Sequence, residues 1–120
     1  MANIFVIDDQ PYMKELIEGE LADEGHHITC IKDSEYVMCH IEESRPDLIL
    51  LDLYLNGFEG WELLNEIKGH DPTVPVLIVT AYDTFFDDPR LARADGYVIK
   101  SINTNELKEK IHEKLTMSAG

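Results

Sequence analysis

Three aspartates stand directly after two strongly apolar segments of this 120-residue chain. Asp8 and Asp9 follow the run at residues 4–7, and Asp52 follows the run at residues 48–51. Short uninterrupted apolar runs are typical of strands buried on both faces of a parallel sheet, and ligands bind beyond the carboxyl ends of such strands. We therefore expect the three carboxylates to share one pocket. Carboxylates held together repel one another, so this pocket is a candidate site for Mg²⁺ or a similar hard divalent cation.

Two further polar residues follow other apolar runs. Thr80 comes after residues 76–79, and Lys100 comes after residues 97–99. Taken singly, each residue has an ordinary interpretation, as a strand-end hydroxyl and a solvated lysine. Beside three acids and a cation, however, a hydroxyl and an ammonium predict a pocket for a phosphoryl group, because both can contact its charged oxygens.

Asp52 is the best candidate for a nucleophile in this pocket. A carboxylate can attack phosphorus and form an aspartyl phosphate, and the run before Asp52 is the most uniformly apolar, which predicts a central strand. Asp8 and Asp9 would then hold the metal, although acids at this place also commonly cap the following helix. The sequence has no glycine-rich phosphate loop, which argues against a nucleotide as phosphoryl donor, and it has neither an acyl-transfer triad nor a zinc-site spacing.

The apolar runs predict five strands that alternate with helices. We expect the strands at 3–7, 27–31, 47–51, 75–79 and 96–99. We expect helices over about 13–24, closed by Gly25; from the N-cap Ser34 to before Pro46; from Gly60 to Gly69; and from about Thr104 onward. The segment 82–93 contains Pro89 and predicts only a short or late helix, and residues 117–120 are expected to be a frayed tail. This alternation predicts one doubly wound α/β domain over residues 1–120.

Composition narrows the possible partners. The 24 acidic residues outnumber the 10 Lys and Arg, which gives a net charge of -14. Such a surface repels nucleic acids and anionic lipid, so we expect neither direct nucleic-acid binding nor a membrane partner, but a basic or mixed protein surface. Neither a secretory signal nor an apolar stretch of about 18 residues is present, which predicts a cytoplasmic location. Cys30 and Cys39 are expected to be reduced, buried small hydrophobes.

In their order and spacing, these residues resemble the receiver domain of two-component response regulators. The resemblance covers essentially the whole chain and rests on Asp8-Asp9, Asp52, Gly60, Thr80-Ala81 and the segment from Tyr97 to Lys100. It implies a flavodoxin-like (βα)5 three-layer sandwich with strand order 2-1-3-4-5. It also implies phosphoryl transfer to Asp52 from a phosphohistidine on a sensor histidine kinase or a histidine phosphotransfer protein. The family catalyses only its own phosphorylation and dephosphorylation.

The resemblance also implies a set of ligands for the metal ion. Asp9 and Asp52 would bind Mg²⁺ directly, whereas Asp8 would act through water. The backbone carbonyl of Tyr54 would supply a further oxygen ligand.

The resemblance further implies which residues contact the phosphoryl group and which residues change conformation on phosphorylation. Lys100, Thr80 and the backbone amide of Ala81 would contact the phosphoryl oxygens. On phosphorylation, the Thr80 hydroxyl and the Tyr97 ring would move together. Their movement would remodel the surface formed by segment 82–93, strand 96–99 and the C-terminal helix, through which the domain would bind a downstream protein or output domain, as a monomer or as a phosphorylation-dependent dimer.

Three features depart from the family pattern. Ser101 stands where the family usually has a proline with a cis bond, and a cis bond before a non-proline residue is costly, so a trans bond is expected. Asn56 and Gly57 replace the usual proline in the loop after the phosphoacceptor, which permits positive φ there. Arg93 replaces a glycine in a segment that is short for the family, which predicts a truncated or distorted helix before the last strand.

Two other functions use the same residues. A metal-dependent phosphohydrolase would also form an aspartyl phosphate, but 120 residues leave little room for a cap or a substrate pocket. A receiver-like interaction module that is never phosphorylated would not need the acids together with Thr80 and Lys100. The sequence leaves open whether the chain is a stand-alone messenger, a phosphorelay intermediate or the receiver of a larger regulator.

Overall fold

The computed structural model of the chain describes residues 2–8, 15, 18–19, 21, 24–54, 60–81, 87–99 and 105–119. The described strands form one parallel five-stranded sheet in the order β2-β1-β3-β4-β5. These strands are β1 (Asn3–Ile7), β2 (His27–Ile31), β3 (Leu48–Leu51), β4 (Val76–Thr80) and β5 (Gly96–Ile99). The observed order confirms the flavodoxin-like doubly wound sheet that the resemblance implied.

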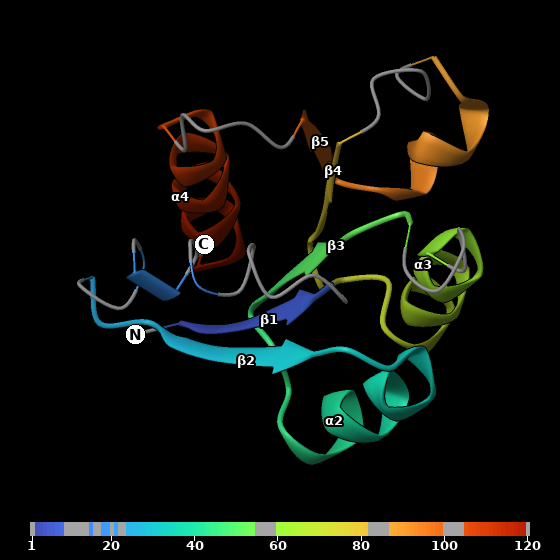
Figure 1. Cartoon of the computed structure of the whole chain (residues 1–120), viewed down its shortest axis with the longest axis horizontal. Helices are drawn as coiled ribbons and strands as arrows, with labels where there is room; N and C mark the ends of the chain where they lie inside the picture. Colours follow the sequence, from blue (N-terminus) through green and yellow to red (C-terminus); the bar gives the residue numbers. More distant parts are fainter. Residues whose placement is uncertain are drawn as a thin grey trace.

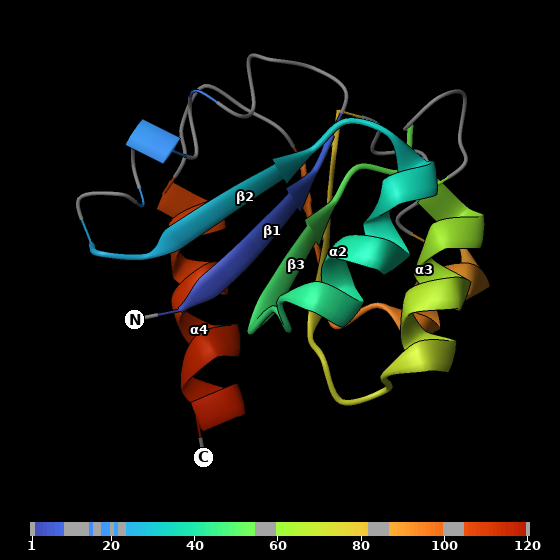
Figure 2. The same cartoon turned by 90° about the horizontal axis from the view of Figure 1, so that it is seen from below.

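Helices cover both faces of this sheet and make three layers (Figures 1 and 2). The described helical segments are η1 (Ser34–Tyr36), α2 (Val37–Glu43), α3 (Gly60–His70), η2 (Pro89–Arg93) and α4 (Asn105–Ala119), where η denotes a 3-10 helix. Residues of α2 and α3 share one core cluster, whereas residues of α4 belong to a second cluster on the opposite face. Leu21, in the expected helix 13–24, is helical and buried in the cluster that contains α4.

The two core clusters reflect the alternating direction of side chains along each strand. Phe5 and Ile7 of β1 face α2 and α3, while Ile4 and Val6 face α4. All residues of β3 are at most 1% exposed, because this strand lies in the centre of the sheet with helices on both sides. An uninterrupted apolar run is what such a doubly covered strand requires.

Strands β1, β2 and β5 have the predicted bounds, β3 begins one residue later than predicted, and β4 is shifted by one residue at both ends. The β3 ladder begins at Leu48. Asp47, just before it, exchanges two hydrogen bonds with Asn3: its carboxylate accepts from the Asn3 N–H at 2.8 Å, and its N–H donates to the Asn3 carbonyl at 2.7 Å. The β4 ladder begins at Val76 because Pro75 has no N–H to donate, although its carbonyl accepts from Ile49 at 3.0 Å. Thr80 is paired with Ile99 and therefore belongs to β4.

Several helix ends correct the sequence predictions. Ser34 is not the N-cap of α2; it begins η1, which opens with a hydrogen bond from the Tyr36 N–H to the Asp33 carbonyl at 3.2 Å. Helix α3 continues one residue past Gly69 to His70. Helix α4 continues to Ala119, so residues 117–119 are helical rather than a frayed tail. In the described part of segment 82–93, the short helix expected there is the 3-10 helix η2.

Gly25 occupies the position that closes the segment before β2, as the sequence predicted. Its φ of 84° lies in the left-handed region, which glycine adopts without the steric cost of a side chain. Thr104, the expected start of the last helix, lies outside the described residues, and α4 is described from Asn105.

Both cysteines are free thiols, but they are less buried than the sequence predicted. Cys39 is exposed on α2, and Cys30 is only partly buried in β2. The negative charge of Glu43 is the main cause that raises the pKa of Cys39, which disfavours the reactive thiolate.

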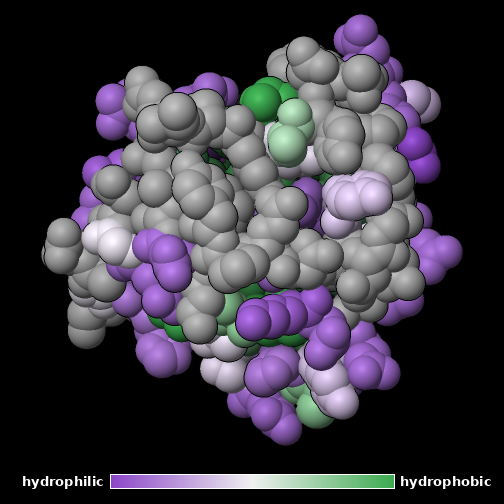
Figure 3. Space-filling view, in the orientation of Figure 1, coloured by the Kyte–Doolittle hydropathy of each residue, from purple (hydrophilic) through white to green (hydrophobic). Residues whose placement is uncertain are grey.

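Hydrophilic side chains cover much of the described surface in the view of Figure 3, and apolar groups are visible in smaller areas between them. Within the described ranges, no helix has both the length and the apolar character needed to cross a membrane. The cytoplasmic location expected from the sequence stays a prediction.

Candidate functional site

Asp8 and Asp52 stand side by side at the carboxyl edge of the sheet. Ile7 and Leu51, the last residues of β1 and β3, are paired in register, so the residue after each strand meets its counterpart. The Asp52 N–H continues this ladder by donating to the Ile7 carbonyl at 3.0 Å. Asp8 and Asp52 are only 8% and 4% exposed. Carboxylates that follow paired strand ends with so little access to water repel one another, which favours positive charge nearby.

The chain turns sharply after Asp52 and is held by its own backbone. The Tyr54 N–H donates to Asp52 Oδ1 at 3.2 Å, which fixes the orientation of the carboxylate. The Gly60 N–H donates to the Leu53 carbonyl at 3.2 Å, so α3 begins directly against this turn. Tyr54 itself is 41% exposed, at the rim of the carboxylate pair.

Gly60 allows an unusually close approach between α3 and this turn. A Cβ atom at Gly60 would lie 2.5 Å from Leu53 Cα, 2.6 Å from the Asp52 carbonyl oxygen and 2.7 Å from the Leu53 carbonyl oxygen. All three are backbone atoms, which cannot rotate away. The sequence singled out Gly60 by its position relative to Asp52, and the structure supplies the physical reason for a glycine there.

Thr80 and Tyr97 lie on the neighbouring strands β4 and β5. Thr80 is fully buried at the end of β4, and the exposed Ala81 follows it. Tyr97 pairs with Ile78 in register and packs against the core cluster of α2 and α3. Because side chains alternate along a strand, Thr80 and Ile78 face the same side of the sheet, which is also the side of Tyr97.

The order of these acids and hydroxyls along a 2-1-3-4-5 sheet matches a known family. The family described as "Response regulator receiver domain" matches residues 4–112 of the chain. The chain belongs to this family. The two-component response regulator PhoP of Pseudomonas aeruginosa is 29% identical to it over 119 residues, covering 98% of this receiver domain and 53% of PhoP. The nitrogen assimilation regulatory protein NtrX of Azorhizobium caulinodans is 37% identical over 82 residues, covering 67% of the chain and 18% of NtrX. The chain thus spans about half of PhoP, and less of NtrX.

Solved structures agree with this assignment over nearly the full length. The response regulator TrrA of Thermotoga maritima, crystallised in complex with Mg²⁺-BeF, has a TM-score of 0.88 and 34% identity to this receiver domain. That match covers 95% of this chain and 99% of TrrA. In a second crystal structure TrrA is in complex with the histidine kinase ThkA, and the match has a TM-score of 0.87, 35% identity and coverage of 96% and 99%. A CheY-like receiver domain protein of Methanospirillum hungatei has a TM-score of 0.89 and 28% identity, covering 99% of this chain and 97% of that protein.

The donor groups of this receiver domain fit a hard cation. Asp8 and Asp52 offer buried carboxylate oxygens at one edge, and oxygen-only donor sets favour Mg²⁺ over softer metals. Among the described residues, no three acidic, histidine or cysteine side chains gather into a metal cluster. The third expected carboxylate, Asp9, lies outside the described residues, as do Lys100, Ser101, Asn56 and Gly57. The expectations for these five residues stay predictions.

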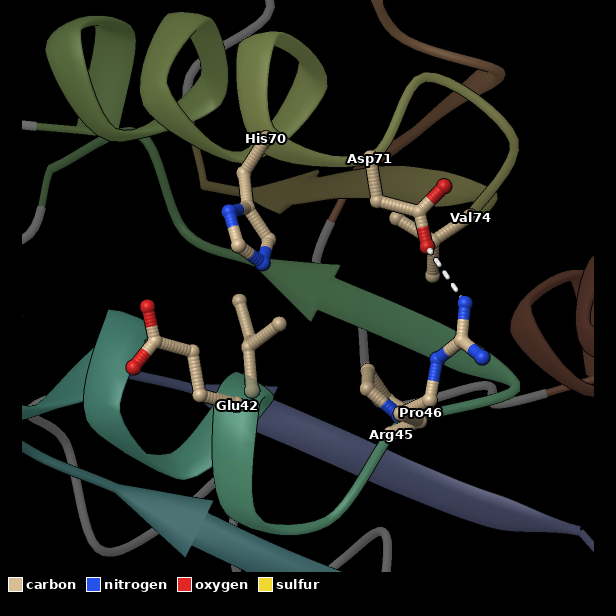
Figure 4. Close-up of a pocket in the computed structure, with 7 residues that line it drawn as sticks. Glu42, Arg45, Pro46, His70, Asp71 and Val74 are labelled. Atoms are coloured by element: carbon tan, nitrogen blue, oxygen red, sulfur yellow. Dashed lines mark ion pairs between the residues drawn. The ribbon is translucent and has the colours of Figure 1, made fainter.

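The pocket drawn in Figure 4 is separate from this site. It has a volume of about 390 Å³ and lies between the ends of α2 and α3, at the amino ends of β3 and β4. His70 and Glu42 point toward each other across it, and Arg45 and Asp71 form an ion pair with a Nη2–Oδ2 distance of 3.8 Å. Asp8 and Asp52 lie at the opposite edge of the sheet, at the carboxyl ends of β1 and β3, so this pocket is not part of their site.

Lys68 is a buried charge that the sequence reasoning did not single out. Its ammonium donates to the Val74 carbonyl at 2.8 Å and to Asp95 Oδ2 at 2.5 Å, and the same Asp95 oxygen accepts from the Val76 N–H at 2.8 Å. These bonds join the end of α3 to the starts of β4 and β5. The sequence pattern could have indicated its burial, because Lys68 falls on the buried stripe of α3 one turn after Leu64.

Proposed function

We propose that this receiver domain accepts a phosphoryl group on Asp52 from the phosphohistidine of a sensor histidine kinase or a histidine phosphotransfer protein. The observation that carries the proposal is the pair of buried carboxylates, Asp8 and Asp52, held side by side by the register of β1 and β3. An Asp52 oxygen attacks phosphorus, the new P–O bond forms, and the P–N bond to the donor imidazole breaks. The departing imidazole nitrogen takes up a proton. The domain catalyses only this phosphorylation and the later hydrolysis of its own acyl phosphate.

The metal site of the proposal uses Asp9, Asp52 and the Tyr54 carbonyl as direct ligands, with Asp8 acting through water. When bound, Mg²⁺ supplies positive charge that offsets the negative charge of the carboxylates and the phosphoryl oxygens. The hydrogen bond from the Tyr54 N–H to Asp52 Oδ1 supports a fixed orientation for the attacking carboxylate. TrrA, which is similar over nearly the whole chain, was crystallised in complex with Mg²⁺-BeF.

The rest of the phosphoryl site is proposed from strand-end residues. Lys100 neutralises a phosphoryl oxygen, and the Thr80 hydroxyl and the Ala81 N–H donate hydrogen bonds to the others. Thr80 and Tyr97 then act as the switch that reports phosphorylation. Their placement on adjacent strands, facing the same side of the sheet, supports a coupled movement of the two side chains.

The proposed partners are proteins. A histidine kinase as phosphoryl donor is supported by the crystal structure of TrrA with the kinase ThkA. The output is binding to a downstream protein or an attached output domain, with the receiver as a monomer or as a phosphorylation-dependent dimer. The net charge of -14 argues against direct nucleic-acid contact by this chain.

Mass spectrometry after incubation with acetyl phosphate and Mg²⁺ tests the proposal. The expected result is a mass gain of one phosphoryl group in the wild type and in Asp47→Asn, and no gain in Asp52→Asn. Asp47 is a matched control because it is an acid at the opposite end of the same strand, and asparagine keeps an oxygen for its bond to Asn3. No gain in the wild type, or an equal gain in Asp52→Asn, would overturn the proposal.

A further inference from the structure

Helix α3 touches the backbone of the phosphoacceptor at one end and η2 along its side. The contact with the phosphoacceptor is the close approach of Gly60 to Asp52 and Leu53, with 2.5–2.7 Å from an added Cβ to their backbone atoms. Because the Gly60 N–H also bonds to the Leu53 carbonyl, a shift of Leu53 must be followed by the first turn of α3. Packed elements of this kind transmit small displacements because the interior is dense.

The next residue, Trp61, connects this turn to η2. Trp61 is only 8% exposed and belongs to the same core cluster as Leu53. The guanidinium of Arg90, in η2, lies 4.0 Å from the centroid of the Trp61 ring. A cation at this distance over an indole is attracted to its π face, with an energy of about 0.5–2 kcal/mol. Figures 1 and 2 both place η2 beside α3.

Asp88 holds the Arg90 guanidinium in this position. Arg90 Nε donates to Asp88 Oδ1 at 3.0 Å, and Nη2 donates to Oδ2 at 2.7 Å, which is a two-point fork. The Arg90 backbone N–H donates to the same carboxylate at 2.9 Å, so Asp88 also caps η2. Hydrogen bonds from Arg90 are the main cause that lowers the pKa of Asp88, so this carboxylate stays ionised to a lower pH than an ordinary aspartate does.

A second contact between the same elements provides a comparison. Arg93, also in η2, donates from Nη1 to Asn65 Oδ1 at 3.1 Å, one helical turn farther from Gly60 along α3. Arg93 attaches η2 to α3 through Asn65, whereas Arg90 lies over the Trp61 ring. Substitution of Arg93, which attaches η2 to α3, can therefore be compared with substitution of Arg90, which contacts Trp61.

We propose that the contact of Arg90 with Trp61 couples the backbone around Asp52 to η2, with Arg90 as a positioning residue. This inference rests on the proposed phosphorylation of Asp52. Phosphorylation shifts the turn at Asp52 and Leu53, Gly60 moves the first turn of α3, and the Trp61 ring carries the movement to Arg90 and η2. The surface that responds is then η2 (Pro89–Arg93), in the segment where the sequence departs from the family pattern.

Amide hydrogen exchange across η2, measured on the full chain with and without acetyl phosphate and Mg²⁺, tests the coupling. The Arg90, Leu91 and Ala94 amides donate hydrogen bonds within this segment and so report its stability. Coupling of ordinary strength predicts a change of about five-fold or more in their exchange rates when Asp52 is phosphorylated. The same samples are weighed by mass spectrometry, and the emission of Trp61, the only tryptophan in the chain, is recorded.

Two variants distinguish coupling through Arg90 from simple attachment of η2 to α3. In Arg93→Ala, phosphorylation should still change η2 exchange and Trp61 emission as in the wild type. In Arg90→Ala, Asp52 should gain the same mass, while the change in η2 exchange falls to less than about two-fold. Asp88→Asn is a third variant, for the case that Arg90→Ala fails to fold. Asparagine keeps an oxygen that can cap η2 but lacks the charge that holds the Arg90 guanidinium. This variant should also reduce the change in η2 exchange on phosphorylation.

Each outcome has a distinct meaning. A mass gain with unchanged η2 exchange in the wild type overturns the coupling and leaves the proposed function intact. An equal response in Arg90→Ala and the wild type also overturns it. Absence of any mass gain overturns the proposed function and the coupling together.

Discussion

Gly60→Ala is expected to destabilise this receiver domain, because the added methyl group has no room. Its carbon would lie 2.5 Å from Leu53 Cα and 2.6 Å from the Asp52 carbonyl oxygen. Carbon atoms in good contact are about 3.5–4.0 Å apart, so α3 or the turn must move by roughly 1 Å. Neither side can yield by rotating a side chain, since every atom involved belongs to the backbone.

The size of the effect follows from two costs and one gain that offsets part of them. Overpacking a well-filled interior costs about 1–3 kcal/mol, and sometimes more when backbone must shift. Moving Gly60 away from Leu53 also weakens the 3.2 Å hydrogen bond between them, which is worth about 0.5–1.5 kcal/mol. Alanine favours helix over glycine by up to about 1 kcal/mol, which offsets part of this cost. The expected loss in the free energy of unfolding is therefore about 1–3 kcal/mol.

Urea unfolding with linear extrapolation measures this loss. Gly69→Ala is the matched control, because Gly69 is in the same helix and a Cβ there meets nothing within 4 Å. It should leave stability unchanged or raise it by up to about 1 kcal/mol. Gly60→Ala should also slow phosphorylation of Asp52 by acetyl phosphate, since the displaced backbone carries that carboxylate. Equal stability of the two variants would refute the reasoning from close approach.

Two further predictions concern polar groups away from Asp52. Lys68→Met should lower the free energy of unfolding by about 1.5–3 kcal/mol in urea, because it leaves Asp95 and the buried Val74 carbonyl without their charged donor; a change under about 0.5 kcal/mol would contradict this. Thr73→Val should raise the pKa of Asp71 in an NMR titration, because the Thr73 hydroxyl bond is the main cause that lowers it. Since this pKa is depressed in the folded state, Asp71 contributes stability above its unfolded pKa and loses it as pH falls through the folded value. The variant should therefore lose that contribution at a higher pH, and an unchanged pKa would remove the hydroxyl as its cause.

The sequence predicted the strands, most helices and the strand-end positions of Asp8, Asp52 and Thr80 well, because these depend on local pattern. An apolar run flanked by helical periodicity identifies a buried parallel strand, and a polar residue after it must lie at the carboxyl edge. Asp8, Asp52 and Thr80 are at that edge, as predicted. Several errors were at boundaries, where one neighbouring residue decides the outcome: Pro75 delays β4, and a 3-10 turn takes the place of a cap at Ser34. The burial expected for Cys30 and Cys39 was also wrong, because it depends on how their elements pack.

The sequence by itself determined the alternation of strands and helices, the family, and the placement of Asp8 and Asp52 at one sheet edge. Only the tertiary structure decided how α3 contacts its surroundings: Gly60 against the backbone of Asp52, Lys68 on Asp95, and Trp61 under Arg90. Periodicity is a local property of the chain and can be read directly. These contacts join residues that are 8 to 29 positions apart in sequence, and they depend on how the elements pack, which local pattern does not specify.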